Sequence, residues 1–270
     1  VEALRSAVDN FFVVSLTAMD LPEAGYVRFR GRFVGDGTET HYDEINERFN
    51  PLGYTPQIHT DKFGAAIITA IPGVHKETDS SYFINLLLFI ATIFSTLYVG
   101  ALYNETSLDY TFSPAWLLTG WPYSISILII LGAHELGHYF AARYHNVPVT
   151  LPFFIPLPTQ YSLIGTMGAF IRLKGRIQNR RVLLDIGASG PLAGMVFALP
   201  ILWYGIATSS VLPLPTTGYL SEGNSLLYLG MKFLIHGQIL PSNGMDISLN
   251  QVAWAGWVGL LVTGLNLLPL

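Results

Sequence analysis

The second half of the chain alternates between long apolar stretches and short polar connections. Tyr82–Tyr103 is an uncharged run of 22 residues, long enough to cross a hydrocarbon core of about 30 Å as a helix. Three more apolar stretches lie at residues 121–146, 183–206 and 251–270. This pattern predicts an all-α, polytopic membrane core of about four transmembrane helices.

The connection between the second and third stretches has a different pattern. The segment is strongly apolar, but its four prolines exclude a continuing helix. They are Pro148, Pro152, Pro156 and Pro158. We expect it to lie at or in the membrane, buried against protein. Residues 161–176 combine glycines with β-prone side chains. They predict a re-entrant segment with a short hairpin or an edge strand, with a plain interfacial loop as the open alternative.

The first 75 residues are more polar and mix two periodicities. Residues 2–14 and 41–54 have helical spacing, whereas residues 26–34 and 65–73 have the pattern of strands. We predict a small water-exposed α+β domain over residues 1–75, with a regulatory or docking role. A polar linker at 75–81 connects it to the membrane domain at 82–270.

Composition supports a membrane protein. The chain is 51% hydrophobic and 12% charged, with a mean hydropathy of +0.43, whereas soluble proteins have about 25% charged residues. The net charge of −4 gives no reason to expect nucleic acid as a partner. Because cysteine is absent, neither disulfides nor thiolate metal ligands are available.

The basic residues predict the orientation. Of the 14 Lys and Arg, seven precede the first apolar stretch, six lie between Arg143 and Arg181, and Lys232 is the last. Because cytoplasmic loops are enriched in Lys and Arg, we expect residues 1–75 and the 140–182 region on the cytoplasmic side, or on the stromal side in a plastid. The predicted location is an inner, cytoplasmic or plastid membrane.

The second apolar stretch ends in the motif HELGH, with His134, Glu135 and His138. Positions i and i+4 share one helix face, so both imidazoles can bind one ion, which we expect to be Zn²⁺. A catalytic zinc needs three protein ligands and an open position for water, and Glu135 is then the candidate general base. Gly137 is expected to leave room for a substrate backbone. A structural cluster is the alternative, but ionisable residues in a membrane segment are costly unless function retains them.

Three later acidic residues are conceivable third ligands. Asp185 lies at the start of the third apolar stretch, where a helix cap is the simpler interpretation. Glu222 and Asp246 are expected on the outer side of the membrane, away from the histidines. No Asp or Glu follows Asp246.

These residues resemble the site-2 proteases, which are intramembrane zinc metalloproteases. The similarity rests on HELGH at 134–138, the proline-rich stretch after it, GASGPLAG at 187–194 and NLLP at 266–269. The amino-terminal domain is similar to that of cyanobacterial and plastid-type members. The resemblance implies that His134 and His138 bind zinc, that Glu135 activates water and that Asn266 lies near the cleavage site. It also implies an Asp as third ligand shortly after NLLP, so we expect the ligand beyond Leu270 and a chain truncated at its C-terminus.

The expected function is therefore an endopeptidase that hydrolyses peptide bonds within or next to transmembrane segments of other proteins. A transmembrane substrate must unwind to expose its carbonyls, and the segment with Gly168, Phe170 and Ile171 can hold it extended by strand addition. Two alternatives are a membrane-anchored zincin that cuts soluble or misfolded proteins, with Glu222 as its third ligand, and a non-catalytic zinc scaffold or transporter. The sequence leaves the oligomeric state open.

Overall fold

The computed structural model describes residues 1–20, 23–35, 41–73, 82–103, 112–157, 162–174, 180–214 and 222–267. It divides into two compact units, unit 1 (Val1–Thr78) and unit 2 (Asp79–Leu270). The predicted polar linker at 75–81 and the end of the last apolar stretch at 268–270 lie outside the described residues.

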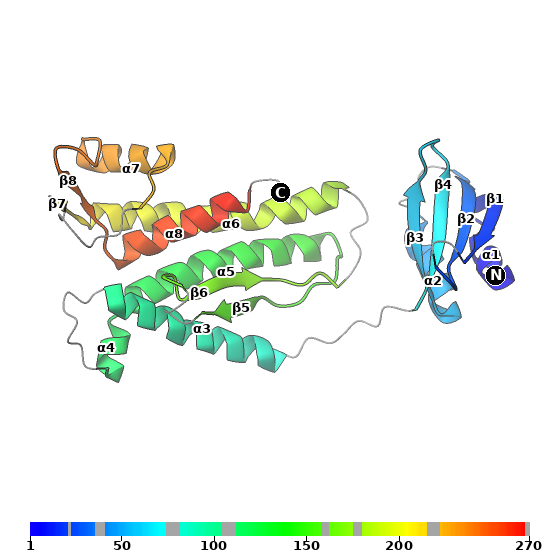
Figure 1. The fold of residues 1–270 in the computed structure, drawn as a ribbon, viewed down its shortest axis with the longest axis horizontal. Coiled ribbons are helices and arrows are strands. Elements are labelled where there is room, and N and C mark those ends of the chain that lie inside the picture. The colour runs from blue at the N-terminus through cyan, green and yellow to red at the C-terminus, as the bar shows by residue number, and fades with distance from the viewer. Residues whose placement is uncertain are drawn as a thin grey trace. The chain divides into compact units, whose positions relative to one another are not determined.

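Unit 1 is a four-stranded antiparallel sheet with two helices packed on one face. Along the chain its elements are α1 (Glu2–Val8), β1 (Phe12–Met19), β2 (Val27–Phe33), α2 (Tyr42–Phe49), η1 (Asn50–Leu52), β3 (Tyr54–Thr60) and β4 (Ala66–Pro72). The strand order is β1-β2-β4-β3 (Figure 1). The core lies between the helices and the sheet and is built from Leu4, Val8, Phe29, Ile45, Phe49 and Ile68.

The sequence predicted only part of this unit. The helix expected over residues 2–14 ends at Val8, and Phe12–Met19 pairs with β2 instead. Strand β3 was not predicted; it pairs with β4 along its whole length. Cross-strand pairing therefore decided both segments, because a strand forms only where a partner is available.

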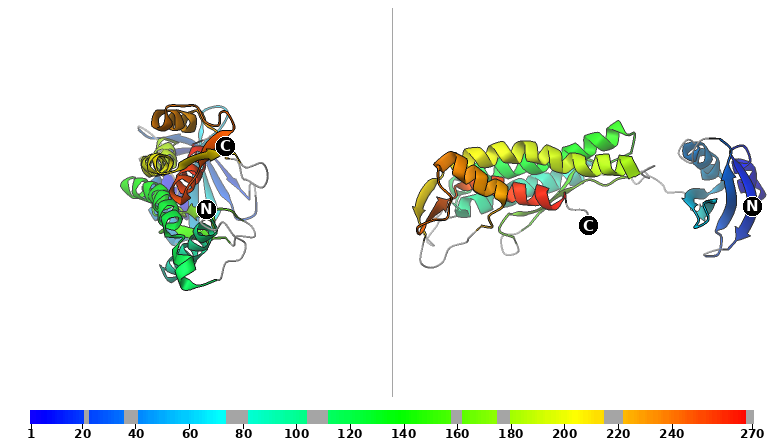
Figure 2. Two further views of the ribbon diagram at one scale, coloured as in Figure 1. Left: turned by 90° about the vertical axis from the view of Figure 1, so that its left-hand side faces the viewer. Right: turned by 90° about the horizontal axis from the view of Figure 1, so that it is seen from above.

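Unit 2 contains helices and two short β-ribbons. Its elements are α3 (Tyr82–Tyr103), α4 (Pro114–Leu118), α5 (Trp121–Tyr144), β5 (Phe153–Pro156), β6 (Thr166–Phe170), α6 (Arg180–Ala207), β7 (Ser210–Pro213), α7 (Leu226–His236), β8 (Met245–Ser248) and α8 (Gln251–Leu265). Helices α5, α6 and α8 pack on one another, and the views of Figure 2 also show α8 against α5 and α6.

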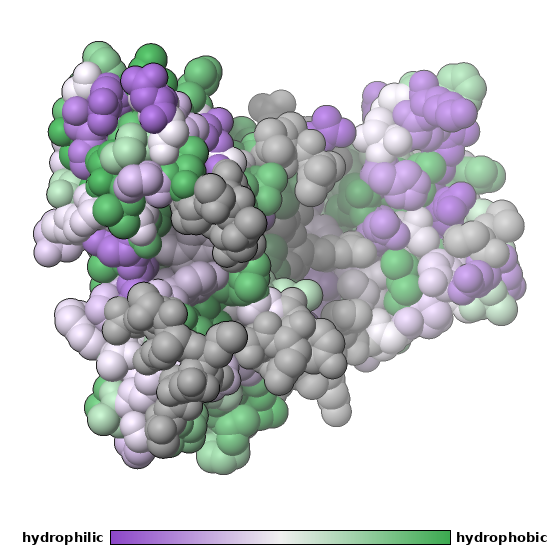
Figure 3. Space-filling model, turned by 60° about the vertical axis from the view of Figure 1, so that its left-hand side comes forward, coloured by the Kyte–Doolittle hydropathy of each residue, from purple (hydrophilic) through white to green (hydrophobic). Residues whose placement is uncertain are grey.

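Among the helices that the structure describes, three are long and apolar enough to cross a membrane. They are α3, α5 and α6. The most apolar 18-residue stretches of these helices have mean hydropathies of 2.0, 1.4 and 1.7, and only 28%, 39% and 28% of these stretches are buried inside the protein. Green hydrophobic residues are accordingly exposed along the visible sides of unit 2 (Figure 3). Such surface is compatible with a lipid environment. Helix α8 has 15 residues and is shorter than a typical span, so the count of four remains a prediction.

The segment between α5 and α6 forms a two-stranded antiparallel ribbon. Strand β6 is the edge strand expected within residues 161–176. Among the described residues it pairs with β5, which belongs to the proline-rich stretch and lies outside 161–176. Side chains from the helices hold this ribbon. The Asn85 amide of α3 donates to the carbonyls of Leu151 and Pro152 at 2.9 and 3.0 Å. The Tyr123 hydroxyl of α5 donates to the Ile164 carbonyl at 2.8 Å.

Candidate metal centre

Helix α5 brings the two histidines of the motif together. It is continuous from Trp121 to Tyr144, so the predicted shared face is formed, and the Nε2 atoms of His134 and His138 lie 3.2 Å apart. Two nitrogen ligands at about 2.0–2.1 Å from a tetrahedral zinc ion are about 3.3 Å apart. The spacing of the two imidazoles therefore fits one edge of a zinc tetrahedron.

Helix α6 orients His138. The ring Nδ1 lies 2.6 Å from the carbonyl oxygen of Ile186, so Nδ1 carries the proton and donates, which leaves the Nε2 lone pair free to bind a metal. This backbone carbonyl is the kind of outer partner that fixes the tautomer of metal-binding histidines.

Small residues on α6 make room for both rings. A Cβ at Gly190 would collide with Nε2, Cδ2 and Cε1 of His138, and a Cβ at Gly194 would lie 3.3 Å from Nδ1 of His134. The glycines of GASGPLAG therefore allow α6 to approach the histidines, as expected for small residues at a helix interface.

The interpretation of Gly137 is wrong. A Cβ at this position would meet the Ser189 carbonyl oxygen of α6 at 2.6 Å and the Ala193 Cβ at 2.8 Å. The flank that was expected to face a substrate is packed against α6. Gly137 serves helix packing.

Glu135 and the ribbon meet beside the histidines. Only 6% of Glu135 is exposed, and its carboxyl group accepts a backbone hydrogen bond from Ile171, the residue directly after β6. Within β6, Gly168 has a φ of 102°, a conformation that favours glycine. Phe170 stacks on Phe153 of β5, with ring centroids 5.5 Å apart. The structure thus brings the candidate base and the predicted substrate strand to one place.

Asn266 lies at the end of α8, where it is the C-cap residue. Its Nδ2 atom is 3.4 Å from Nε2 of His134, although the two residues are 132 positions apart in sequence. The structure therefore places Asn266 beside the candidate metal ligands. Its role in substrate binding remains a prediction.

The described residues do not contain a group of three His, Cys, Asp or Glu that could hold a metal ion. Asp185 lies inside α6, which begins at Arg180, so its interpretation as a helix cap is wrong. Its carboxylate lies 3.2 Å from Nε2 of His145, and this contact joins the end of α5 to α6. The predicted third ligand, an Asp beyond Leu270, stays a prediction.

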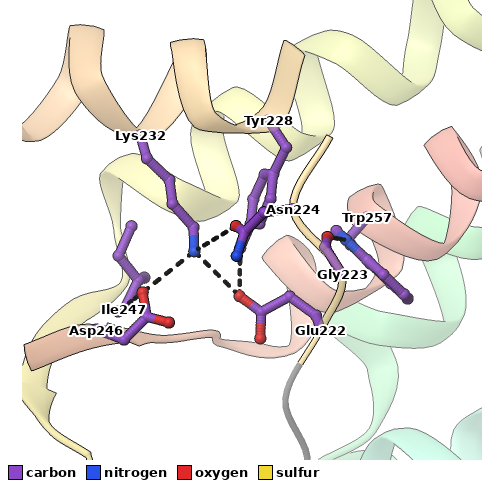
Figure 4. Close-up of polar contacts among 8 residues, drawn as sticks. All are labelled: Glu222, Gly223, Asn224, Tyr228, Lys232, Asp246, Ile247 and Trp257. Carbon is purple, nitrogen blue, oxygen red and sulfur yellow. Dashed lines mark hydrogen bonds and ion pairs between the residues drawn. The ribbon is translucent and has the colours of Figure 1, made fainter. Parts of the chain in front are cut away.

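The other two acidic residues belong to a polar cluster that the sequence did not reveal (Figure 4). Lys232 of α7 is completely buried and lies 3.2 Å from Glu222 and 3.1 Å from Asp246 of β8. Tyr228 donates a hydrogen bond to Glu222 at 2.8 Å, and the Trp257 indole of α8 donates to the Gly223 carbonyl at 3.0 Å. This cluster fastens α7 to the segments on both sides of it and occupies Glu222, the ligand that the zincin alternative requires.

Comparisons with known proteins identify the family of this chain. Residues 122–270 match peptidase family M50. A protein named probable zinc metalloprotease EGY2, chloroplastic, from Oryza sativa subsp. japonica is 28% identical over 271 residues, which are 97% of this chain and 48% of that protein. The protein of the same name from Arabidopsis thaliana is 28% identical over 282 residues, which are 100% of this chain and 49% of that protein.

A third relative, named probable zinc metalloprotease EGY1, chloroplastic, from Oryza sativa subsp. japonica, is 28% identical over 213 residues, 70% of this chain and 35% of that protein. The chain thus spans about half the length, or less, of these relatives. No solved structure matches it. The family match covers the motif helix α5, the ribbon, α6 and α8, which together form the candidate centre. The resemblance to the site-2 proteases is confirmed, and the chain belongs to peptidase family M50.

Proposed function

We propose that this chain supplies His134 and His138 as two of the zinc ligands of a metalloendopeptidase, which cuts membrane-anchored proteins within or next to their transmembrane segments. The proposal rests on two Nε2 atoms 3.2 Å apart beside a buried carboxyl group, in a helix apolar enough to cross a membrane. Relatives that match nearly the whole chain are named zinc metalloproteases, which supports zinc as the metal.

The residues of the site divide the chemical work. When bound here, zinc supplies a Lewis acid that acidifies its water and polarises the scissile carbonyl. Glu135 takes the proton from the attacking water at its carboxylate and returns it to the leaving amine. The Ile186 carbonyl keeps His138 in the metal-binding tautomer. We propose that the Asn266 amide, whose Nδ2 lies 3.4 Å from Nε2 of His134, donates a hydrogen bond to a substrate carbonyl.

Strand β6 is the proposed substrate platform. One of its edges pairs with β5, and in the part of the chain that the structure describes no strand pairs with the other edge. An extended substrate segment can add there as a third strand through main-chain hydrogen bonds. Because Ile171 already contacts Glu135, a substrate along Gly168, Phe170 and Ile171 would pass the candidate base.

The bilayer is the proposed environment of unit 2. We propose a multi-pass integral membrane protein whose partners are lipid and transmembrane substrates, with unit 1 on the cytoplasmic or stromal side. The relatives are named as chloroplast proteins, which supports a plastid membrane; an inner or cytoplasmic membrane is the alternative.

The decisive experiment replaces the base. Glu135→Gln should keep zinc and lower turnover of a membrane-embedded substrate by about 10²–10⁴-fold, because only the proton acceptor is lost. Glu47→Gln, at an exposed position of α2, is the control and should leave turnover unchanged. Near-normal cleavage by Glu135→Gln would refute the assignment.

A second experiment separates intramembrane cleavage from the alternatives. The same cleavage sequence is offered in a transmembrane segment and in a soluble peptide, and metal flux is measured in parallel. Phe170→Pro, which removes a backbone donor of β6, should slow cleavage of the transmembrane form with zinc content unchanged, whereas Phe170→Ala should affect it less. Preferential cleavage of the soluble peptide would favour a zincin, and metal flux without cleavage would favour a transporter.

A further inference from the structure

Unit 1 presents a sheet face that its helices do not cover. In β2, Val27 and Phe29 belong to the core beneath the helices, so the alternating residues Arg28, Arg30 and Arg32 lie on the opposite face. None of the four strands contains an Asp or Glu. The face is therefore a row of arginines without acidic residues in the strands around it.

An apolar margin lies beside the arginine row. On the edge strand β1, Val13 pairs with Arg32 and Leu16 pairs with Arg30 across a bulge. Val13 is 52% exposed and Leu16 is 58% exposed. We call Val13, Leu16, Arg28, Arg30 and Arg32 the basic face.

Two of the three arginines are not neutralised by a described carboxylate. Arg30 forms an ion pair with Asp61, the aspartate of the β3–β4 turn, at 2.6 Å. Within the described residues no ion pair joins Arg28 or Arg32 to a carboxylate, and Nε of Arg28 is buried without a hydrogen-bond partner. The basic face therefore has positive charge available for an anionic ligand.

The helices of unit 1 contain more acidic than basic residues. Residues 1–73 contain six Lys and Arg and ten Asp and Glu, so the unit as a whole is acidic. Glu2 belongs to α1, and Glu44 and Glu47 to α2, the helices that cover the opposite face of the sheet. A negative surface would therefore attract the basic face and repel the helical side.

The short linker between unit 1 and α3 determines which negative surface unit 1 can always reach. Eight residues separate Gly73 from Tyr82, the first residue of α3, and an extended chain of this length reaches no more than about 30 Å. Since α3 is apolar enough to enter a bilayer, lipid headgroups are present near unit 1 at a high effective concentration. Arg32 is exposed and Arg28 is partly exposed on the same face. Arginines next to exposed aliphatic side chains are suited to the interface between headgroups and acyl chains.

We propose that the basic face of unit 1 docks on the anionic phospholipid headgroups of the bilayer that α3 enters. Arg28 and Arg32 contact phosphate groups, and Val13 and Leu16 rest at the level of the upper acyl chains. This role depends on the membrane insertion of α3 and is independent of peptide hydrolysis.

The test uses the cysteine-free background of the chain. The whole chain is reconstituted in nanodiscs with a single environment-sensitive fluorophore, either at Leu16→Cys on the basic face or at Glu47→Cys on α2. The discs contain phosphatidylcholine alone or phosphatidylcholine with phosphatidylglycerol, each with a brominated lipid as quencher. We expect quenching of the Leu16→Cys label in the anionic discs only, reversed by high salt, and no quenching of the Glu47→Cys label.

Two charge-matched variants supply the control. Arg32→Gln and Arg5→Gln remove the same charge from exposed positions, on the basic face and on α1 respectively. Arg32→Gln should raise the phosphatidylglycerol fraction needed for quenching by about fivefold, whereas Arg5→Gln should leave it unchanged. Equal effects of both variants, equal quenching in neutral discs, or quenching in neither disc would overturn the proposal, and the last result would favour an acidic protein as the partner.

Discussion

Gly190→Ala should selectively destroy the candidate metal centre. In an exposed helix interior this change is stabilising by about 1 kcal/mol, because glycine has the poorer helix propensity. At Gly190 the added Cβ would collide with the ring of His138, so either the imidazole turns away from His134 or α6 moves back. Overpacking of this kind costs about 1–3 kcal/mol.

The larger effect should fall on metal affinity. Loss of a hydrogen-bonding partner of a metal ligand already costs about 10–100-fold in affinity, so displacement of His138 itself should weaken zinc binding by at least about 100-fold. Gly187→Ala is the matched control on the same helix, because in the described part of the chain no neighbouring segment has an atom within 4 Å of its added Cβ. We expect this control to bind zinc normally and to be as stable as the wild type or slightly more stable.

The measurement is competition for zinc between the purified protein and a chromophoric chelator, with thermal unfolding recorded for both variants. Normal zinc affinity in Gly190→Ala would show that His138 is not a ligand held against α6. Equal losses in both variants would show that α6 tolerates no added methyl group, and the argument from the His138 ring would fail.

Three other predictions test different parts of the molecule. Lys232→Met should destabilise unit 2 by about 3–5 kcal/mol, because it leaves Glu222 and Asp246 without their cation. In chemical denaturation, the triple variant that adds Glu222→Gln and Asp246→Asn should recover much of this loss. No recovery would refute the charge argument. Burial, and then the neighbouring Glu222 carboxylate, raise the pKa of Tyr228. The stabilising contribution of the protonated Tyr228 should therefore be complete below a pH of about 10 and be lost as the pH rises further. In an absorbance titration, Tyr228→Phe should have one late-titrating tyrosine fewer than the wild type, and an unchanged titration would contradict this prediction. Reporters placed within residues 1–75 and at residue 178 should label from the cytoplasmic or stromal side, and one within 104–113 from the opposite side; opposite-side labelling at residue 178 would refute the predicted topology.

Local properties of the sequence were sufficient for the long helices and for the two histidines. The uncharged run Tyr82–Tyr103 is helix α3 residue for residue, because the length of an apolar stretch and its helix are properties of one segment. The spacing of His134 and His138 likewise placed both rings on one side of α5, since the i,i+4 relation is fixed by helix geometry.

The arrangement around the histidines depended on the tertiary structure. The partner of β6 comes from the proline-rich stretch, Gly137 faces α6, and Asn266 reaches His134 from the end of α8. Each contact joins segments far apart in the sequence, and local periodicity carries no information about which distant face a residue will meet. The Lys232 cluster has the same origin: three separate polar residues, Glu222, Lys232 and Asp246, become one buried network only when α7 and β8 pack together, because a buried charge is tolerated only where its partners converge on it.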